Sequence, residues 1–224
     1  MSYGINVTTS YGRKVIDTEV LPFRIKSTGV SASVTGIYSY SPSLQCNLIP
    51  MPAANEALAI SIVGDRQVYN TGDAYPSPGL NTTKTHYIFA NFQNYSTTIK
   101  WAIFDAVPAD TSGYGLKVRS SSGALLFNSL NQQFAVKARG FANATLSTPL
   151  PVTLPYAADY YIHYPLISSD VLLQYYSSPY AMRMHPMIQT SGGTAYIGIT
   201  EFGEDSWTTA PTSVSVAAFS GKIV

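Results

Sequence analysis

The chain has 224 residues, a formal net charge of +1 and only 11% charged residues. It contains no run of Lys or Arg, so a nucleic-acid-binding protein is disfavoured, because phosphate contacts require a basic surface. A single cysteine, Cys46, excludes an internal disulfide and a four-cysteine metal site. The 46% of hydrophobic residues suffice for a packed core, and the sparse charge predicts a polar, nearly neutral surface suited to burial against neighbouring subunits.

Membrane insertion and secretion are not expected. No stretch reaches the roughly 18–20 apolar residues of a membrane-spanning helix. The start of the chain also lacks the basic segment and apolar run of a secretory signal.

The first elements in the chain form a predicted β-hairpin. Apolar runs at residues 5–7 and 14–16 flank the turn residues 10–12, where Gly12 can adopt a positive φ. The strands expected after this hairpin in the first half lie at residues 23–25, 33–38, 58–63, 86–90 and 98–104.

The second half begins by repeating the first. Residues 3–29 align without a gap on residues 114–140, an offset of 111 residues. The identical pairs are Tyr3/Tyr114, Gly4/Gly115, Val7/Val118, Ser10/Ser121, Gly12/Gly123, Phe23/Phe134, Lys26/Lys137 and Gly29/Gly140. Because this period is about half the chain, it predicts a tandem duplication of one domain and not a solenoid.

The remaining elements complete the second copy. A hairpin at residues 116–127 matches the first one, and strands at residues 195–199 and 214–219 match residues 86–90 and 99–104. Only residues 53–58 and 168–175 are compatible with a helical turn or two. The Pro/Gly/Ser/Asp-rich residues 107–113 have the composition of a link between domains.

Many short strands separated by Gly/Pro turns favour a β-sandwich. We therefore predict an all-β protein of two tandem, internally duplicated antiparallel β-sandwich domains, residues 1–110 and 111–224. Each domain is expected to fold around its own apolar centre.

The segments around the link resemble a known group of proteins. Residues 101–105 (WAIFD), 114–118 (YGLKV) and 123–129 (GALLFNS) resemble small structural proteins of tailed-bacteriophage tail tips, baseplates and tail fibres. Those proteins share Tyr-Gly-Leu, an alternating strand, a Gly turn and an aliphatic-Phe-Asp-Ser run. The first copy has Ile16 in place of Phe and keeps Asp17, whereas the second keeps Phe127 and has Asn128 in place of Asp.

This resemblance implies a virion protein of the phage tail, made in the bacterial host cytoplasm, with no cofactor and no catalytic residues. Its implied partners are copies of itself in a symmetric oligomer and other tail proteins.

The residues themselves give no sign of an enzyme or a metal site. Cys46 has no Gly-x-Cys turn and no positive neighbour to lower its pKa, so we expect a buried, inert thiol. His86, His163 and His185 lack the spacing of metal ligands. The acidic residues 201–205 lack the pattern of a calcium loop.

Aromatic side chains supply the binding candidates. Seventeen Tyr and two Trp on a low-charge sandwich suit either glycan stacking or a protein interface. Trp101 is expected in the core, because it lies within an alternating strand. The candidates for contact are Tyr75, Tyr175, Tyr176, Tyr180 and Trp207. We favour protein–protein assembly, and the alternative is a receptor-binding module that recognises a host-surface glycan.

Overall fold

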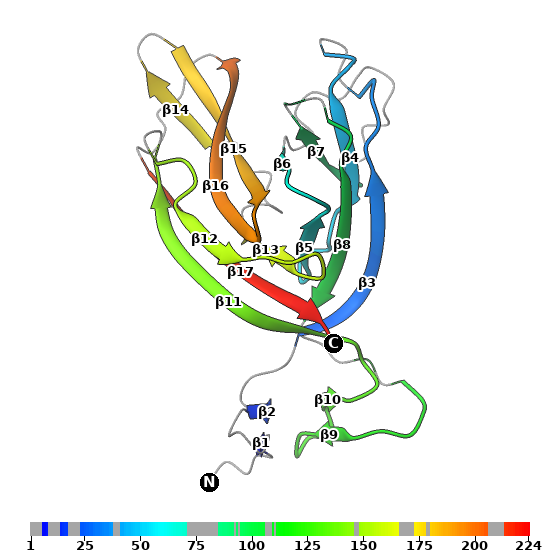
Figure 1. The fold of residues 1–224 in the computed structure, drawn as a ribbon. Helices are drawn as coiled ribbons and strands as arrows, with labels where there is room; N and C mark the ends of the chain where they lie inside the picture. The colour runs from blue at the N-terminus through cyan, green and yellow to red at the C-terminus, as the bar shows by residue number, and fades with distance from the viewer. Residues whose placement is uncertain are drawn as a thin grey trace.

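The computed structural model describes residues 6–8, 14–17, 23–37, 41–70, 85–91, 93, 95–105, 109, 111–145, 148–165, 173–177, 180–205 and 213–224. Of residues 6–8, 14–17, 173–177, 180–184 and 201–205 it describes the backbone. Within these ranges the fold is all-β, every strand pairing is antiparallel and there is no α-helix (Figure 1). The prediction of an all-β protein is confirmed at this level.

The strands in chain order are β1 (Asn6–Thr8), β2 (Lys14–Asp17), β3 (Phe23–Ala32), β4 (Gln45–Pro50), β5 (Ala57–Ile62), β6 (Gln67–Asn70), β7 (His86–Asn91), β8 (Thr98–Asp105), β9 (Lys117–Arg119), β10 (Leu125–Asn128), β11 (Gln133–Ala144), β12 (Val152–Pro155), β13 (Tyr161–His163), β14 (Leu173–Ser177), β15 (Tyr180–Ser191), β16 (Thr194–Asp205) and β17 (Val214–Ile223).

These strands form four sheets. A closed barrel has the order β11-β17-β13-β5-β8-β3, with β3 returning to β11. A second sheet has the order β12-β16-β15-β6-β7-β4, and β14 pairs with β15 beside it. The hairpins β1–β2 and β9–β10 form two small sheets of their own, beyond the place where β3 meets β11 (Figure 1).

Strand pairing in one half of the chain recurs in the other. The strand order of each large sheet is symmetric about its middle. In the barrel, β3, β8 and β5 correspond to β11, β17 and β13. In the second sheet, β4, β7 and β6 correspond to β12, β16 and β15. The hairpin pairs Asn6–Asp17 and Lys117–Asn128 differ by the same 111 residues as the sequence repeat. The register shifts recur as well, because the β3–β8 ladder is irregular at Lys26 and the β11–β17 ladder at Lys137.

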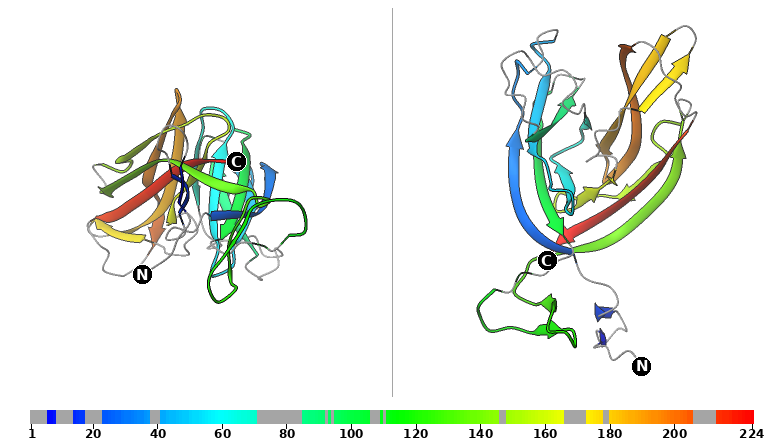
Figure 2. Two further views of the ribbon diagram at one scale, coloured as in Figure 1. Left: turned by 90° about the horizontal axis from the view of Figure 1, so that it is seen from below. Right: turned by 180° about the vertical axis from the view of Figure 1, so that it is seen from behind.

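The two halves of the chain meet by backbone pairing in both large sheets. In the barrel, β5 pairs with β13, with Ala59 opposite His163, and β3 pairs with β11, with Phe23 opposite Phe134. In the other sheet β6 pairs with β15, with Tyr69 opposite Met187. Away from these contacts the halves spread into two arms, as the right view of Figure 2 shows.

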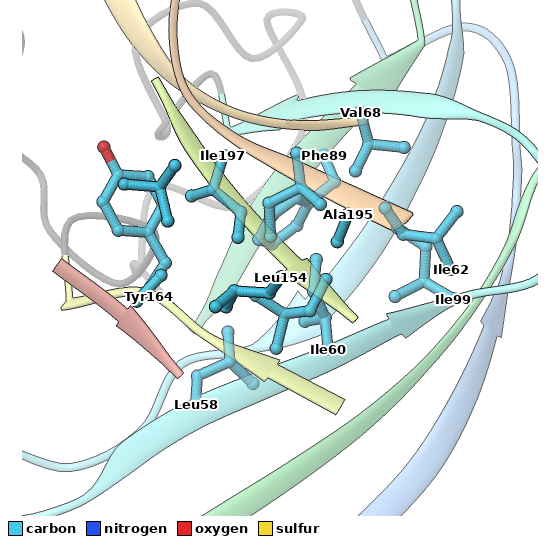
Figure 3. Packing of buried hydrophobic residues seen from close by; sticks show 14 of the residues in the cluster. Leu58, Ile60, Ile62, Val68, Phe89, Ile99, Leu154, Tyr164, Ala195 and Ile197 are labelled. Carbon is cyan, nitrogen blue, oxygen red and sulfur yellow. The ribbon is translucent and has the colours of Figure 1, made fainter. Parts of the chain in front are cut away.

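The largest apolar cluster lies where the halves meet, and it takes residues from both. It contains Leu58, Ile60, Ile62, Val68, Phe89 and Ile99 of the first half, and Leu154, Ile162, Tyr164, Ile188, Ala195 and Ile197 of the second (Figure 3). The expectation of a separate apolar centre in each half is therefore wrong, because strands of the two halves lie side by side. The division at residue 110, which falls between β8 and β9, stays a prediction as a domain boundary.

A smaller cluster of rings lies across the barrel. The ring of Phe104 stacks on Phe134 at 5.0 Å between centroids and meets the edges of Phe23 and His163 at 5.2 and 5.3 Å. His163 in turn stacks on Phe219 at 5.9 Å. These rings come from five strands, so the cluster ties together the walls of the barrel that the two halves share.

Three local predictions are corrected by the structure. The strand expected at residues 33–38 does not form over residues 33–37, because β3 ends at Ala32 and Val34 makes only an isolated bridge to Cys46; residue 38 lies outside the described residues. Residues 53–56 form a turn closed by the bond from Glu56 N to Ala53 O at 2.9 Å, followed directly by β5. In the segment 168–175, β14 begins at Leu173, and residues 168–172 lie outside the described residues.

We predict that removing volume from the shared core destabilises the whole chain. Val68, fully buried, pairs with Ile188 across the β6–β15 seam. Val68→Ala should lower the free energy of unfolding by about 2 kcal/mol, because two buried methyl groups are lost. Urea denaturation followed by tryptophan fluorescence and by far-UV circular dichroism should show one coincident transition.

Val63→Ala is the matched control, because Val63 is 46% exposed. Its effect should stay within about 0.5 kcal/mol. Two separate transitions, or equal effects of the two substitutions, would contradict a single core.

Candidate assembly interface

The structure describes only part of the aromatic set predicted from sequence. Tyr75 and Trp207 lie outside the described residues. The backbones of Tyr175 and Tyr176 in β14 lie beside that of β15, where Tyr180 pairs with Ser177. This hairpin brings three of the five candidates onto adjacent strands, and their role in binding stays a prediction.

The environment of Cys46 makes its thiol unreactive. Its side chain is fully buried in β4, and burial raises the pKa of the thiol to about 12. A thiol with such a pKa carries almost no thiolate near neutral pH. Among the described residues, no group of three His, Cys, Asp or Glu side chains is arranged to hold a metal ion.

The three histidines lie on different strands, and each has its own hydrogen bond. His86 of β7 is exposed and bonds to the Thr85 hydroxyl at 2.9 Å, while Nδ1 of the buried His185 lies 3.0 Å from the Asn70 carbonyl. His163 Nδ1 lies 2.8 Å from the Leu58 carbonyl. Since a carbonyl only accepts, His163 Nδ1 carries the proton and donates it. Burial lowers the pKa of His163, and this hydrogen bond opposes the shift.

We predict that His163 makes the barrel sensitive to acid. Its pKa in the folded chain lies below the ordinary value of about 6.5, so the unfolded chain binds more protons in this range. Stability should therefore fall as the pH drops through about 6.5 and below. His163→Phe keeps a ring between Phe104 and Phe219 but does not titrate, so its unfolding free energy should vary less with pH over this range.

The same substitution at the exposed His86 serves as the control and should leave the wild-type pH dependence in place. If His163→Phe and the wild type lose stability equally between pH 7 and pH 5, the histidine is not responsible.

The β9–β10 hairpin is held to the preceding link by Asn128. This side chain is almost fully buried, and its Nδ2 donates to the Ala109 carbonyl at 2.9 Å and to Thr111 Oγ1 at 3.0 Å. Its Oδ1 accepts a bond from the Leu130 backbone N–H at 3.1 Å. The amide therefore uses both its donor and acceptor ends. An aspartate, the residue at this place in the first copy, has no donor for the Ala109 carbonyl.

Exposed apolar side chains flank the two strands of this hairpin in the chain. Tyr114 is fully exposed, and Leu116 and Leu130 are 48% and 42% exposed. The Leu130 side chain lies against Gly113 and Gly115, where an added Cβ would come within 3.0 Å of it. Leu130 thus reaches the backbone on both sides of Tyr114. We call Tyr114, Leu116 and Leu130 the hairpin patch.

Substituting Asn128 tests the anchoring of the hairpin. Asn128→Asp should lower the free energy of opening the hairpin by about 1–3 kcal/mol. The carboxylate leaves the Ala109 carbonyl without this donor and brings a charge into a buried position. Hydrogen exchange of the Lys117–Arg119 amides should speed up accordingly. Asn143→Asp is the control, since Asn143 is exposed and its Oδ1 accepts from Ser215 Oγ, a role that a carboxylate retains. Equal exchange rates in Asn128→Asp and wild type would contradict the anchoring role.

A second exposed apolar region lies on the outer strands β3 and β11. Val30 is 66% exposed and Phe141 is 71% exposed, and the two occupy equivalent positions of the repeat. On the opposite side of β3, Trp101 covers Gly29, where an added Cβ would lie 2.4 Å from the indole. Trp101 packs partly buried against the main core, in agreement with its expected position.

Sequence reasoning singled out neither the hairpin patch nor these outer-strand residues as candidates. The repeat aligns Val30 with Phe141, each directly after a glycine, Gly29 or Gly140, but their exposure is apparent only in the structure.

Comparisons with protein-family models, with curated proteins and with solved structures found no match. Within the part of the chain that the structure describes, no helix is long and apolar enough to cross a membrane.

Proposed function

We propose that this protein is a structural subunit of a bacteriophage virion, a tail-tip or baseplate component that acts by protein–protein assembly and supports tail fibres. The proposal starts from the resemblance of the segments around residues 101–129 to small phage tail proteins. A surface with few charges supports it, because charged residues are depleted at the cores of protein interfaces.

The observation that carries the proposal is the hairpin patch. Tyr114 contributes a fully exposed ring beside two half-exposed leucines, on an element that lies apart from the barrel (Figure 1). Exposed apolar clusters on soluble proteins mark interaction sites. Burial of such side chains stabilises a contact by about 25 cal/mol per Å² of apolar surface, before the costs of association are subtracted.

We also propose that the two halves descend from one β-sandwich unit copied in tandem. Two observations support a copied unit: the constant offset of the hairpin registers and the recurrence of the irregularity at Lys26 and Lys137. Within each half, three strands of the barrel pack against three strands of the second sheet, as in a sandwich. In the first half these are β3, β8 and β5 against β4, β7 and β6. In this proposal the copies fused edge to edge and gained a common core.

Substitution of the hairpin patch tests the assembly role. A Tyr114→Ser, Leu116→Ser double variant should fold normally, because both side chains are exposed, yet enter virions at least 10-fold less than wild type. Incorporation is measured by quantifying the subunit in purified particles. Val63→Ser, an exposed apolar residue on the β5–β6 turn, is the control and should assemble normally.

Normal incorporation of the double variant would remove the hairpin patch from the proposal, and absence of the wild-type chain from purified particles would remove the virion role. The same particles test the glycan alternative. If Trp207→Ala abolishes adsorption to host cells while assembly stays intact, the chain is a receptor-binding module.

A further inference from the structure

The outer strands β3 and β11 each present a long unpaired edge. They pair with each other only where they cross, at Phe23–Phe134 and Arg24–Gln133, with one further bond from Ile25 N to the Gln132 carbonyl. Beyond this crossing, β3 has β8 as its one partner and β11 has β17, among the strands that the structure describes. Among the described strands, the other side of each therefore has no backbone partner, apart from the isolated Val34–Cys46 bridge just after β3.

These edges lack the charges that usually protect exposed strands from pairing. Residues 27–32 of β3 include no ionisable side chain, and residues 138–144 of β11 include only Arg139. The basic residues nearer the crossing on β3 are neutralised, since Arg24 pairs with Asp105 and Lys26 with Glu56. Both edges carry a large exposed apolar side chain, Val30 or Phe141.

We propose that β3 of one copy of this chain adds to β11 of a second copy as an antiparallel strand. The two strands are repeat equivalents that already pair with each other at their crossing, so their compatibility is established within the chain. A β11–β11 contact is disfavoured because it would bring Lys137 and Arg139 of both copies together without a carboxylate. The neutralised β3 edge has no such conflict.

The hydrogen bonds of β3 indicate the register. Ser33 N donates to the Thr97 carbonyl, just before β8, at 3.0 Å. By alternation Ser27, Gly29 and Ser31 therefore direct their backbone groups toward β8, and Thr28, Val30 and Ala32 direct theirs to the open side. The repeat equivalents of these three outward-facing residues on β11 are Arg139, Phe141 and Asn143. A register with Val30 opposite Phe141 makes these two a hydrogen-bonded pair, with Thr28 opposite Asn143 and Ala32 opposite Arg139.

Such a contact joins two different surfaces, so it links subunits head to tail. Head-to-tail contacts close into rings when the rotation permits and otherwise extend into filaments. This interface deepens the proposed assembly role and rests on it, and it names a second copy of the chain as the partner.

A pair of cysteines tests this interface in the full chain. Val30→Cys combined with Phe141→Cys should form disulfides between subunits on mild oxidation with diamide, giving a ladder of linked oligomers on a non-reducing gel. Disulfides require Cα atoms within about 7 Å. Within one chain the two positions lie seven residues beyond the crossing on strands that run apart, about 23 Å along each strand. The buried Cys46 thiol does not compete.

Each single variant should stay monomeric on the same gel, and Val63→Cys with Phe141→Cys, which lies outside the proposed register, should give at least 10-fold less product. Dimers from Val30→Cys alone or Phe141→Cys alone would overturn the head-to-tail pairing. A defined oligomer without disulfide between positions 30 and 141 would overturn this interface and leave the assembly role standing. A monomer that is also absent from virions would overturn both.

Discussion

The structure depends on the backbone pairing that joins the halves of the chain, β5 to β13 in the barrel and β6 to β15 in the facing sheet. These ladders make both sheets continuous across the two halves. The side chains beside them, among them Ile60, Ile162 and Ile188, are fully buried and belong to one cluster. Separation of the ladders would expose this cluster to water, so the apolar core and the backbone pairing stabilise each other.

The two halves meet through corresponding strands, and they also differ there. Ala59 faces His163 and Phe23 faces Phe134, so equivalent strands oppose each other at the seam. At the seam the two halves differ in chemistry, because Ala59 of the first half faces the imidazole of His163 in the second. The hairpin shows a similar difference, since Asn128 uses a donor that the equivalent Asp17 lacks. The two halves therefore resemble each other more closely in backbone pairing than in side-chain contacts.

Much of the local structure could be predicted from the sequence, while its long-range pairing could not. Alternation and turn residues correctly indicated the hairpins and the strand at residues 98–104, which the structure confirms as β8. Short strands such as β6 and β13 were missed, because three or four residues show no period. The shared core was missed because alternation shows which face of a strand is buried but not its partner. Ile60 and Ile162 are 102 residues apart, and no local pattern distinguishes pairing across halves from pairing within one. The hairpin patch can be recognised only from the exposed fractions of its side chains, which the structure supplies.

Native-state hydrogen exchange in low concentrations of urea tests the shared core most directly. If the halves form one cooperative unit, the slowest amides of β6 and β15 should exchange through the same global opening. Their opening free energies should then converge on one line as urea rises. Amides of β15 that open with a lower free energy and a smaller urea dependence than those of β6, up to the unfolding transition, would show that the second half unfolds alone and would contradict a common core.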